Sequence, residues 1–254
     1  MQAVVVTGAA QGVGKVVAQT FAQAGWAVVL ADIQPLDGLV AEMAAAGYTV
    51  SALAGDQADP AYVSALAAHV GTRHGAADAL VNNAGISFIT PAEKISLEQW
   101  QRVLAVNLTG PFLLSQALGA QMLARGRGAI VNVASVAGLG GVIHRAAYNA
   151  SKHGLVGLTR TLAAEWGGRG VRCNAVCPGW IKTEMDKADM GSGAYTDADI
   201  VNRVPQARFA SPQDIAGAIL FLATAPFVNG VTLPVDGGWS ADFSWDALRL
   251  KTRG

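Results

Sequence analysis

Short apolar runs alternate with longer segments of helical period along most of the chain. The runs are mostly apolar and β-branched, and they do not alternate strictly between apolar and polar residues, as expected of strands buried on both faces of a parallel sheet. The alanine-rich segments between them have helical length, so the pattern is typical of repeated strand–helix–strand units. We expect strands at Ala3–Val6, Ala27–Ala31, Val50–Ala54, Ala79–Val81, Ala129–Val133, Arg172–Val176 and Thr232–Val235, and helices near Val13–Ala24, Leu36–Ala46, Ala61–Arg73, Leu97–Met122, Ala147–Trp166 and Pro212–Ala223.

These elements predict an α/β fold: one doubly wound domain over residues 1–254, with a seven-stranded parallel sheet and helices on both faces. Two segments interrupt the alternation. Residues 184–208 are polar and long for a connection, which predicts a substrate loop or lid. Residues 240–254 follow the last strand and include Phe243 and Trp245, so we expect this tail to dock on its own or a neighbouring subunit.

Composition narrows the class of protein. Of 254 residues, 52% are apolar and 14% charged, and 18 Lys and Arg balance 18 Asp and Glu, which gives a formal net charge of zero. A binding surface for nucleic acid or an anionic membrane is not expected with this balance. No stretch approaches the roughly 18 uninterrupted apolar residues of a membrane span. The apolar surplus therefore predicts a large core together with subunit interfaces.

The cysteines and the amino terminus add two expectations. Cys173 and Cys177 have no neighbouring metal ligands, so we interpret them as reduced core thiols and expect no metal site. The first residues run directly into the apolar segment Ala3–Val6, with no basic segment or cleavage site. This start predicts a cytoplasmic protein.

A glycine-rich turn follows the first strand, and the chain is helical after it. A dinucleotide pyrophosphate needs a turn without Cβ atoms and the amino end of a helix, whose partial positive charge faces the anion. Gly8, Gly12 and Gly14 meet both needs. The second strand ends at Asp32, whose carboxylate would accept hydrogen bonds from the adenosine ribose of NAD and repel the 2′-phosphate of NADP. Because uncharged Ile33 follows it, the sequence favours NAD.

A tyrosine, a lysine and a serine form a candidate catalytic group. Tyr148 and Lys152 are spaced i and i+4 in a helical stretch, so they project from one face. Ser135 follows a strand end, where a doubly wound sheet places its ligand groups. To act as a base at neutral pH, a phenol of pKa near 10 needs a downward shift of about three units, roughly 4 kcal/mol. A neighbouring ammonium and the positive charge of a nicotinamide both act in that direction.

Over about residues 3–239 these motifs resemble the classical short-chain dehydrogenase/reductase family. The matching segments are the glycine turn, Asn82–Gly85, Asn107, Ser135, Tyr148 with Lys152, Pro178–Gly179 and Asp236–Gly238. The resemblance implies a Rossmann-type fold and hydride transfer between NAD and the CH–OH group of a small molecule. It also implies a homotetramer, with a dimer as the less favoured assembly.

The resemblance assigns roles to individual residues. Tyr148 would be the general acid/base, and Ser135 would hold and polarise the substrate oxygen. Lys152 would bind the nicotinamide ribose and lower the pKa of Tyr148, while Asn107 would hold a water that passes the proton to solvent. Asp56 has two interpretations, a contact to the adenine edge or a cap on its own turn. Cofactor contacts are implied for Gly8, Gln11, Gly12, Val13, Gly14, Asp32, Ile33, Asp56, Gln57, Asn83, Ala84, Gly85, Tyr148, Lys152, Pro178, Gly179, Ile181 and Thr183.

Substrate specificity is expected between Ser135 and Tyr148 and in the polar loop after Thr183. Arg145 precedes the tyrosine by three residues, and with Ser135, His144, Tyr148 and Trp180 it would line the substrate pocket. A guanidinium there would clamp a carboxylate, sulfonate or phosphate, or bind several hydroxyls. A salt bridge at a subunit interface is the other interpretation of Arg145. Our preferred substrate is a small polyol, sugar or sugar-acid alcohol.

Two other functions stay open. A 3-oxoacyl-[acyl-carrier-protein] reductase shares the outline of the chain. Such enzymes usually take NADPH and present a basic surface to their acidic carrier. Asp32 argues against NADPH, and the zero net charge argues against a basic surface. Enoyl reductases of this fold generally space tyrosine and lysine more widely than four residues. The alternative from another class is a non-catalytic, nucleotide-sensing regulatory protein. The intact Ser135, Tyr148 and Lys152 argue against it.

Overall fold

Seven parallel strands form one sheet in the computed structural model, which describes residues 1–182, 196–251 and 253. Their order is β3-β2-β1-β4-β5-β6-β7, so the direction of winding reverses between β1 and β4. This is the doubly wound topology that the sequence predicts, and ligands bind such sheets at the reversal. The strands are β1 Ala3–Thr7, β2 Ala27–Asp32, β3 Val50–Ala54, β4 Ala79–Asn82, β5 Gly128–Val133, β6 Val171–Pro178 and β7 Thr232–Val235.

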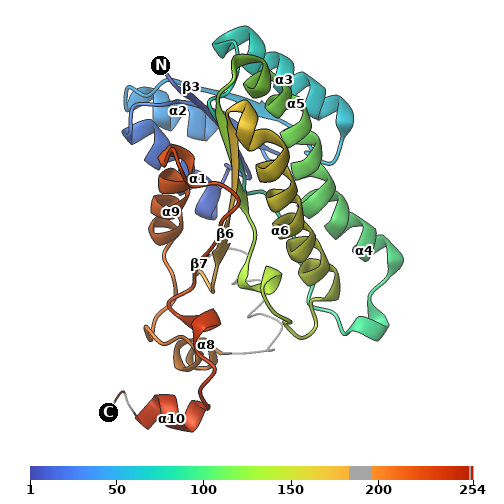
Figure 1. Cartoon of the computed structure of the whole chain (residues 1–254), viewed down its shortest axis with the longest axis vertical. Helices are drawn as coiled ribbons and strands as arrows, with labels where there is room; N and C mark the ends of the chain where they lie inside the picture. Colours follow the sequence, from blue (N-terminus) through green and yellow to red (C-terminus); the bar gives the residue numbers. More distant parts are fainter. Residues whose placement is uncertain (183–195, 252, 254) are drawn as a thin grey trace.

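Helices cover both faces of the sheet (Figure 1). Side chains from α1, α2 and α9 pack on one face, and those from α3, α5 and α6 pack on the other. Two short helices, α8 and α10, lie beyond the sheet near the carboxyl terminus. The helices are α1 Gly12–Gln23, α2 Asp37–Ala45, α3 Pro60–His74, α4 Leu97–Leu104, α5 Gly110–Arg125, α6 Ala146–Trp166, α8 Asp197–Arg203, α9 Pro212–Thr224 and α10 Asp246–Lys251.

The single helix expected over Leu97–Met122 is divided, which corrects the prediction from periodicity. A π-helical turn, Ala105–Thr109, separates α4 from α5. The amide of Gln57 donates to the Val106 carbonyl at 2.8 Å and so satisfies a carbonyl of the widened turn. Gly110 lets Gln57 lie this close, because a Cβ at Gly110 would be 2.9 Å from Gln57 Cγ. A contact from a residue so distant in sequence leaves no trace in local hydrophobic spacing.

The helical run Leu97–Arg125 has the length and composition of a membrane-crossing helix, with a mean hydropathy of 1.4, and is the one such run among the described residues. Half of its most apolar window is buried within the fold. Leu114, Leu118 and Met122 from this run belong to the core cluster under the sheet. Packing in the core of the fold therefore explains the apolar composition of this run.

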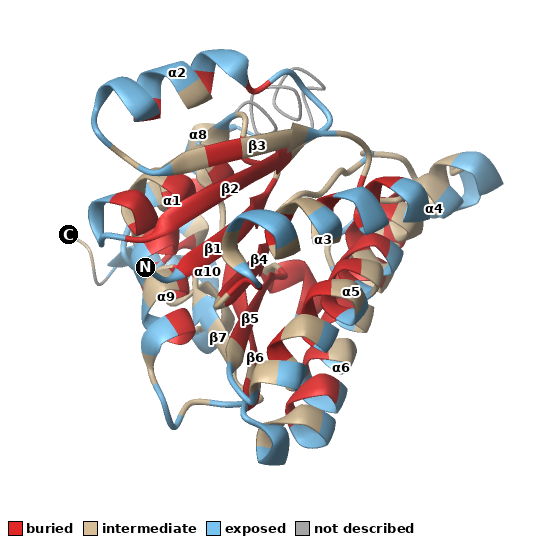
Figure 2. Cartoon of the chain, turned by 90° about the horizontal axis from the view of Figure 1, so that it is seen from above, coloured by how far each residue is buried: buried red, intermediate tan, exposed pale blue. Residues whose placement is uncertain are grey.

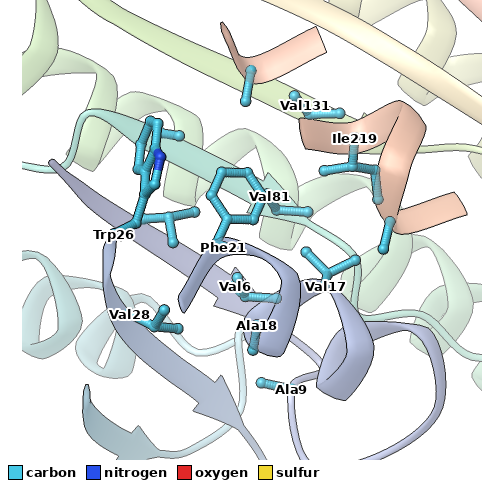
Figure 3. Close-up of a cluster of buried hydrophobic side chains, with 14 of the residues drawn as sticks. Val6, Ala9, Val17, Ala18, Phe21, Trp26, Val28, Val81, Val131 and Ile219 are labelled. Carbon is cyan, nitrogen blue, oxygen red and sulfur yellow. The ribbon is translucent and has the colours of Figure 1, made fainter. Parts of the chain in front are cut away.

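Apolar burial is concentrated in the strands and on the sheet-facing sides of the helices, while the outer sides of the helices are exposed (Figure 2). One core cluster lies between the sheet and α1 and α9, with Phe21 and Trp26 in edge-to-face contact at 5.1 Å between ring centroids (Figure 3). Continuous valine and leucine runs suit this arrangement because both faces of each central strand are covered.

The two cysteines are free thiols in this core, as the sequence predicts. Burial raises the pKa of Cys173 to about 12 and that of Cys177 to about 11. Both side chains therefore stay protonated and unreactive at neutral pH.

A buried polar network joins β4, β5 and α6 beneath the strand ends. Asn132 accepts from the Asn82 amide at 2.8 Å and donates to the Thr159 hydroxyl at 2.9 Å. Asn82 also donates to Ser115 on α5 at 3.3 Å. Asn82 thus stabilises the sheet. The network fixes β5 against α6; Ser135 follows β5, and α6 carries Tyr148 and Lys152.

We expect Asn132→Ala to lower the free energy of unfolding by about 1–3 kcal/mol, because it removes the buried hydrogen bonds of this side chain to Asn82, Thr159 and Cys173. Urea unfolding measures the change. Thr161→Ala is the matched control, since the Thr161 hydroxyl makes an exposed bond within α6. Equal effects of the two substitutions would contradict the role given to the network.

Candidate active site

A cavity of about 430 Å³ lies at the carboxyl ends of the strands, where the winding reverses. It runs from the glycine turn after β1, past the ends of β2, β3 and β4, to Ser135 and to Tyr148 on α6. All the predicted cofactor residues in the described part of the chain line this cavity. The sequence motifs therefore converge on one continuous site.

The glycine turn leaves room for a close backbone approach. Gly8 has φ +64°, and a Cβ there would lie 2.8 Å from the Ala84 backbone. A Cβ at Gly14 would lie 1.9 Å from the Gly8 carbonyl oxygen, so only glycine allows helix α1 to start so close to the turn. The Gln11 side chain does not cap this helix, and no acidic residue lies in its first turn. The amino end of α1 is thus suited to a pyrophosphate.

Asn83 connects the glycine turn to the loop after β4. Its amide donates to the Thr7 carbonyl at 2.9 Å and to the Gly8 carbonyl at 3.2 Å. The Thr7 hydroxyl accepts in turn from the backbone N–H groups of Asn83 and Ala84. These bonds hold both walls of the cavity at a fixed separation, so the Asn83 side chain positions the backbone that would face a cofactor.

Asp32 ends β2 and lines the cavity. One carboxylate oxygen accepts from the Ala10 backbone N–H at 2.9 Å, and the other accepts from the Gln34 N–H at 2.9 Å. The carboxylate is therefore fixed beside the glycine turn. Lys15, the nearby cation in the sequence, forms an ion pair with Glu42 at 2.8 Å.

Asp56 and Gln57 reach the cavity in different ways. Asp56 caps its own turn by accepting from the Ala58 N–H at 2.9 Å, and it also pairs with Arg102 of α4 at 2.7 Å. The Gln57 side chain is buried, and its amide donates to the carbonyls of Ala84 and Val106. This side chain holds protein segments together, and the cofactor contact expected of Gln57 stays a prediction.

Ser135, Tyr148 and Lys152 meet at the inner end of the cavity. The Lys152 Nζ donates to the Val133 carbonyl at 2.7 Å and lies 5.5 Å from the centre of the Tyr148 ring. Burial lowers the pKa of Lys152 to about 8, with the nearby Cys177 acting weakly in the opposite direction. The Ser135 hydroxyl accepts from the Ala137 N–H at 3.1 Å and can still donate to a substrate oxygen.

Asn107 lies in the π-helical turn and is fully buried. Its side-chain oxygen accepts from the Ile86 N–H at 2.8 Å, and its amide donates to the Ile86 carbonyl at 2.9 Å and to Ser151 at 3.2 Å. The side chain thus fixes the loop beyond Gly85 beside the active-site helix α6. Its expected role in holding a water stays a prediction.

The predicted substrate residues have separate outcomes. Arg145 and Trp180 line the cavity, and Arg145 donates to the Ser87 hydroxyl at 2.7 Å. His144 is exposed and is not among the described residues that line the cavity, so its expected contact with the substrate stays a prediction. Its backbone has φ +59°, and its carbonyl accepts from the Thr90 N–H, so it shapes the loop before Arg145. Thr183 and residues 184–195 lie outside the described residues.

Arg102 and Trp239 are two of the residues at or beside the site that were not predicted from the sequence. Arg102 lines the cavity one helical turn before Val106, and only its pairing with Asp56 marks it. Trp239 stacks on the cavity residue Trp180 at 4.3 Å between ring centroids. An aromatic residue directly after Asp236–Gly238 was the available signal for Trp239, whereas nothing in the sequence singled out Arg102.

A glycine cradle for a dinucleotide, joined to a tyrosine–lysine–serine group, defines a nicotinamide-dependent dehydrogenase or reductase acting on CH–OH groups. A family model described as Enoyl-(Acyl carrier protein) reductase matches residues 8–240. The chain is 42% identical over 239 residues to D-threitol dehydrogenase of Mycolicibacterium smegmatis, covering 92% of this chain and 91% of that protein. It belongs to the short-chain dehydrogenase/reductase family, as its motifs indicate.

Two further relatives bear on its chemistry. A 3-oxoacyl-[acyl-carrier-protein] reductase of Synechocystis is 39% identical over 243 residues, covering 93% of this chain and 96% of that protein. The crystal structure of a gluconate 5-dehydrogenase from Burkholderia cenocepacia, in complex with NADP and tartrate, superposes with a TM-score of 0.90. It is 33% identical, and the match covers 95% of this chain and 96% of that one.

The buried Lys152 predicts a pH-dependent difference in stability. Because its pKa falls from 10.5 to about 8 in the native protein, the unfolded chain binds more protons at this site between those pH values. The wild type should therefore gain up to about 3 kcal/mol relative to Lys152→Met as the pH rises through this window. Urea unfolding of the cofactor-free protein measures this gain. Exposed Lys94→Met is the control, and a pH-independent difference for Lys152→Met would contradict the burial effect.

Proposed function

We propose that the chain is an NAD-dependent dehydrogenase that interconverts a secondary alcohol and a ketone, with Tyr148 as the general acid/base. The observation that carries this proposal is the single continuous cavity between the glycine turn and the Ser135, Tyr148 and Lys152 group. A dinucleotide of extended length would lie along it with its pyrophosphate at α1. When bound, NAD supplies the hydride acceptor.

In the oxidative direction, Tyr148 removes the proton of the substrate hydroxyl as hydride leaves the adjacent carbon. The Ser135 hydroxyl donates to the same substrate oxygen and holds it within reach of the phenol. The Lys152 ammonium favours the ionised phenol by its positive charge. In the reductive direction Tyr148 returns the proton to the oxygen. Acid/base catalysis of this kind requires the proton donor and the proton acceptor to lie within hydrogen-bond reach of each other. A substrate in the cavity can meet this requirement because Ser135 and Tyr148 both line it.

Lys152 would also bind the nicotinamide ribose. One of its three N–H groups is used on the Val133 carbonyl, and the others are available to a ribose hydroxyl. Gly85 leaves space for this contact, because a Cβ there would lie 3.6 Å from Lys152 Nζ. The proposal therefore gives Lys152 two tasks at one position, ribose binding and stabilisation of the phenolate.

Asp32 supports the preference for NAD over NADP. Its carboxylate is held in the cavity at the end of β2, where an adenosine ribose would lie. A 2′-phosphate at this position would face a fixed negative charge, whereas two ribose hydroxyls would donate to it. The gluconate 5-dehydrogenase of Burkholderia cenocepacia is in complex with NADP, and the comparison of NAD with NADP in the wild type and in Asp32→Ala tests the preference of this chain.

The proposed substrate class is a small polyol, sugar or sugar-acid alcohol. Arg145 lines the cavity and is held by its bond to the Ser87 hydroxyl, and its guanidinium would suit several hydroxyls or a carboxylate of a substrate. D-threitol and gluconate, the compounds in the names of two relatives, have this chemistry. The Synechocystis relative supports a 3-oxoacyl-[acyl-carrier-protein] reductase as the second candidate.

We further propose a cytoplasmic homotetramer. Several large apolar side chains are exposed on the outer helices, including Phe112 of α5 and Phe221 of α9, and Phe227 is fully exposed. Such side chains are typical of subunit interfaces. Light scattering at several protein concentrations would test the assembly, and a monomer at micromolar concentration would contradict it.

Tyr148→Phe should abolish turnover and leave NADH binding nearly unchanged, because the substitution removes only the phenolic oxygen. We expect a loss of about a thousandfold or more in kcat. Stopped assays at high enzyme concentration measure kcat, and NADH fluorescence measures binding. Turnover near that of the wild type would contradict the role of Tyr148, while NADH binding without turnover in the wild type would instead support a nucleotide sensor.

Asp32→Ala should narrow the preference for NAD. We expect the wild type to favour NAD over NADP by about tenfold or more in kcat/KM at saturating substrate. The substitution removes both the hydrogen bonds to the ribose and the repulsion of the 2′-phosphate, so efficiency with NAD should fall and that with NADP should rise. Equal use of both cofactors by the wild type would overturn the argument from Asp32.

A substrate panel monitored by NADH absorbance tests the substrate class. It contains polyols, sugars, sugar acids, hydroxy acids and aliphatic secondary alcohols, and a separate arm supplies a 3-oxoacyl thioester with NADPH. We expect the highest kcat/KM among polyols, sugars or sugar acids. Activity confined to the thioester arm would replace the proposed function by the second candidate.

A further inference from the structure

The cavity wall at Trp180 is supported from behind by an aromatic stack. The indole of Trp180 lies nearly parallel to that of Trp239, with an interplanar angle of 15° and 4.3 Å between ring centroids. Trp180 follows β6 and Trp239 follows β7, so the stack joins two neighbouring strand ends. The turn before Trp239 is fixed by Asp236, which accepts from the backbone N–H groups of Gly238 and Ser240.

Helix α8 is attached to this stack at its last residue. The Arg203 guanidinium lies over the Trp239 ring at 4.8 Å, and it donates to the carbonyls of Trp239 and Asp242. Val204, directly after α8, packs tightly on the turn that precedes Trp239, because a Cβ at Gly237 in that turn would lie 2.6 Å from Val204 Cγ1. The position of α8 and the position of the Trp180 wall are therefore linked.

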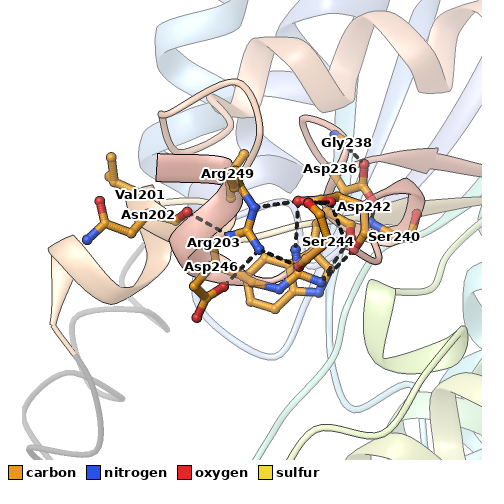
Figure 4. A network of polar contacts seen from close by, with 12 residues as sticks. Val201, Asn202, Arg203, Asp236, Gly238, Ser240, Asp242, Ser244, Asp246 and Arg249 are labelled. Atoms are coloured by element: carbon orange, nitrogen blue, oxygen red, sulfur yellow. Dashed lines mark hydrogen bonds and ion pairs between the residues drawn. The ribbon is translucent and has the colours of Figure 1, made fainter. Parts of the chain in front are cut away.

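Arg249 of the carboxyl-terminal helix α10 joins the tail to α8 (Figure 4). It is only 7% exposed, and its guanidinium pairs with Asp242 and with Asp246. The same guanidinium donates to the Asn202 carbonyl of α8 at 2.8 Å. Ser244 holds the pKa of Asp242 down to about 2, with Arg249 adding to the effect, so the pair stays ionised at neutral pH.

Apolar burial does not hold this tail in place. Phe243 is 93% exposed and Trp245 is 84% exposed, so neither aromatic residue of the tail packs on the described part of its own chain. The other end of α8 is held by an ion pair between Lys182 and Asp197, both well exposed, and exposed pairs contribute little. Arg253 adds contacts to the carbonyls of Val201 and Val204. The buried guanidinium of Arg249 thus joins the tail to the last turn of α8, together with Arg253.

We propose that Arg249 is a positioning residue for substrate specificity, acting through α8, Trp239 and Trp180 on the substrate half of the cavity. Loss of Arg249 leaves Asp242 without its buried partner and frees the Asn202 carbonyl, so the last turn of α8 keeps only the contacts of Arg203 and Arg253 with the tail. Arg203 and Trp239 are then held less firmly, and Trp180 loses part of its support. The glycine turn and Asp32 lie at the other end of the cavity and keep their contacts.

The test compares Arg249→Met with Lys251→Met, a matched control in which an exposed lysine of the same helix is replaced. Near-ultraviolet circular dichroism of the full-length, cofactor-free protein reports on the stacked indoles, and Trp239→Phe identifies their contribution among the six tryptophans. We expect Arg249→Met to lose most of the contribution that Trp239→Phe removes, Arg249→Lys to lose part of it, and Lys251→Met to retain it. An unchanged spectrum for a folded Arg249→Met protein would overturn the proposal.

The kinetic arm rests on the proposed function and uses the best substrate of the panel. Arg249→Met should raise the KM for that substrate by about fivefold or more while kcat and the KM for NAD stay within about twofold of the wild type. A parallel rise in both KM values would overturn the positioning role, since it would indicate general destabilisation. If the panel contains no substrate, the proposed function fails while the spectroscopic arm still decides the link between Arg249 and the indole stack.

Discussion

The buried ammonium of Lys152 is the constraint around which this protein is arranged. It is almost fully removed from water, and the Val133 carbonyl accepts a hydrogen bond from it at 2.7 Å. A charge in such a place must be compensated, and here the same cation lies beside the Tyr148 ring. Holding it requires α6 to cross the end of β5 closely. Gly138 permits this approach, because a Cβ there would lie 2.8 Å from the Lys152 carbonyl oxygen.

Hydrogen bonds elsewhere in the fold hold β5, α6 and Lys152 in these relative positions. The hydrogen bonds of Asn132 to Asn82 and Thr159 join β5 to β4 and to α6 from below. Asn83 ties the loop after β4 to the glycine turn after β1. Displacement of any one of these strand ends would therefore shift both the dinucleotide cradle and the catalytic group. The proposed substrate residues Arg145 and Trp180 come from later segments, and Trp180 stacks on Trp239, which Arg203 of α8 contacts. In the proposed function, the sheet therefore builds the cofactor half of the cavity, and segments after β5 contribute to the substrate half.

Much of this architecture was predictable from the sequence, for physical reasons that differ by element. Strands such as β1 and β2 are buried on both faces and so appear as continuous apolar runs, and Gly8 and Gly14 mark close approaches that only glycine allows. Long-range contacts were not predictable. The π-helical turn around Asn107 depends on Gln57, and the pairing of Asp56 with Arg102 joins α4 to a distant loop. His144 is adjacent to Arg145 in sequence, yet it has a left-handed backbone and is exposed, and it is not among the described residues that line the cavity.

The central claim is that one cavity brings the CH–OH carbon of a substrate next to a nicotinamide while Tyr148 exchanges the hydroxyl proton. Isotope transfer tests it most directly. The best alcohol of the panel, deuterated at the carbon that is oxidised, is incubated with NAD, and nuclear magnetic resonance locates the label. The account predicts quantitative transfer of deuterium to the C4 position of the nicotinamide. Release of the label into water, or its retention in the product, would contradict direct hydride transfer in this site.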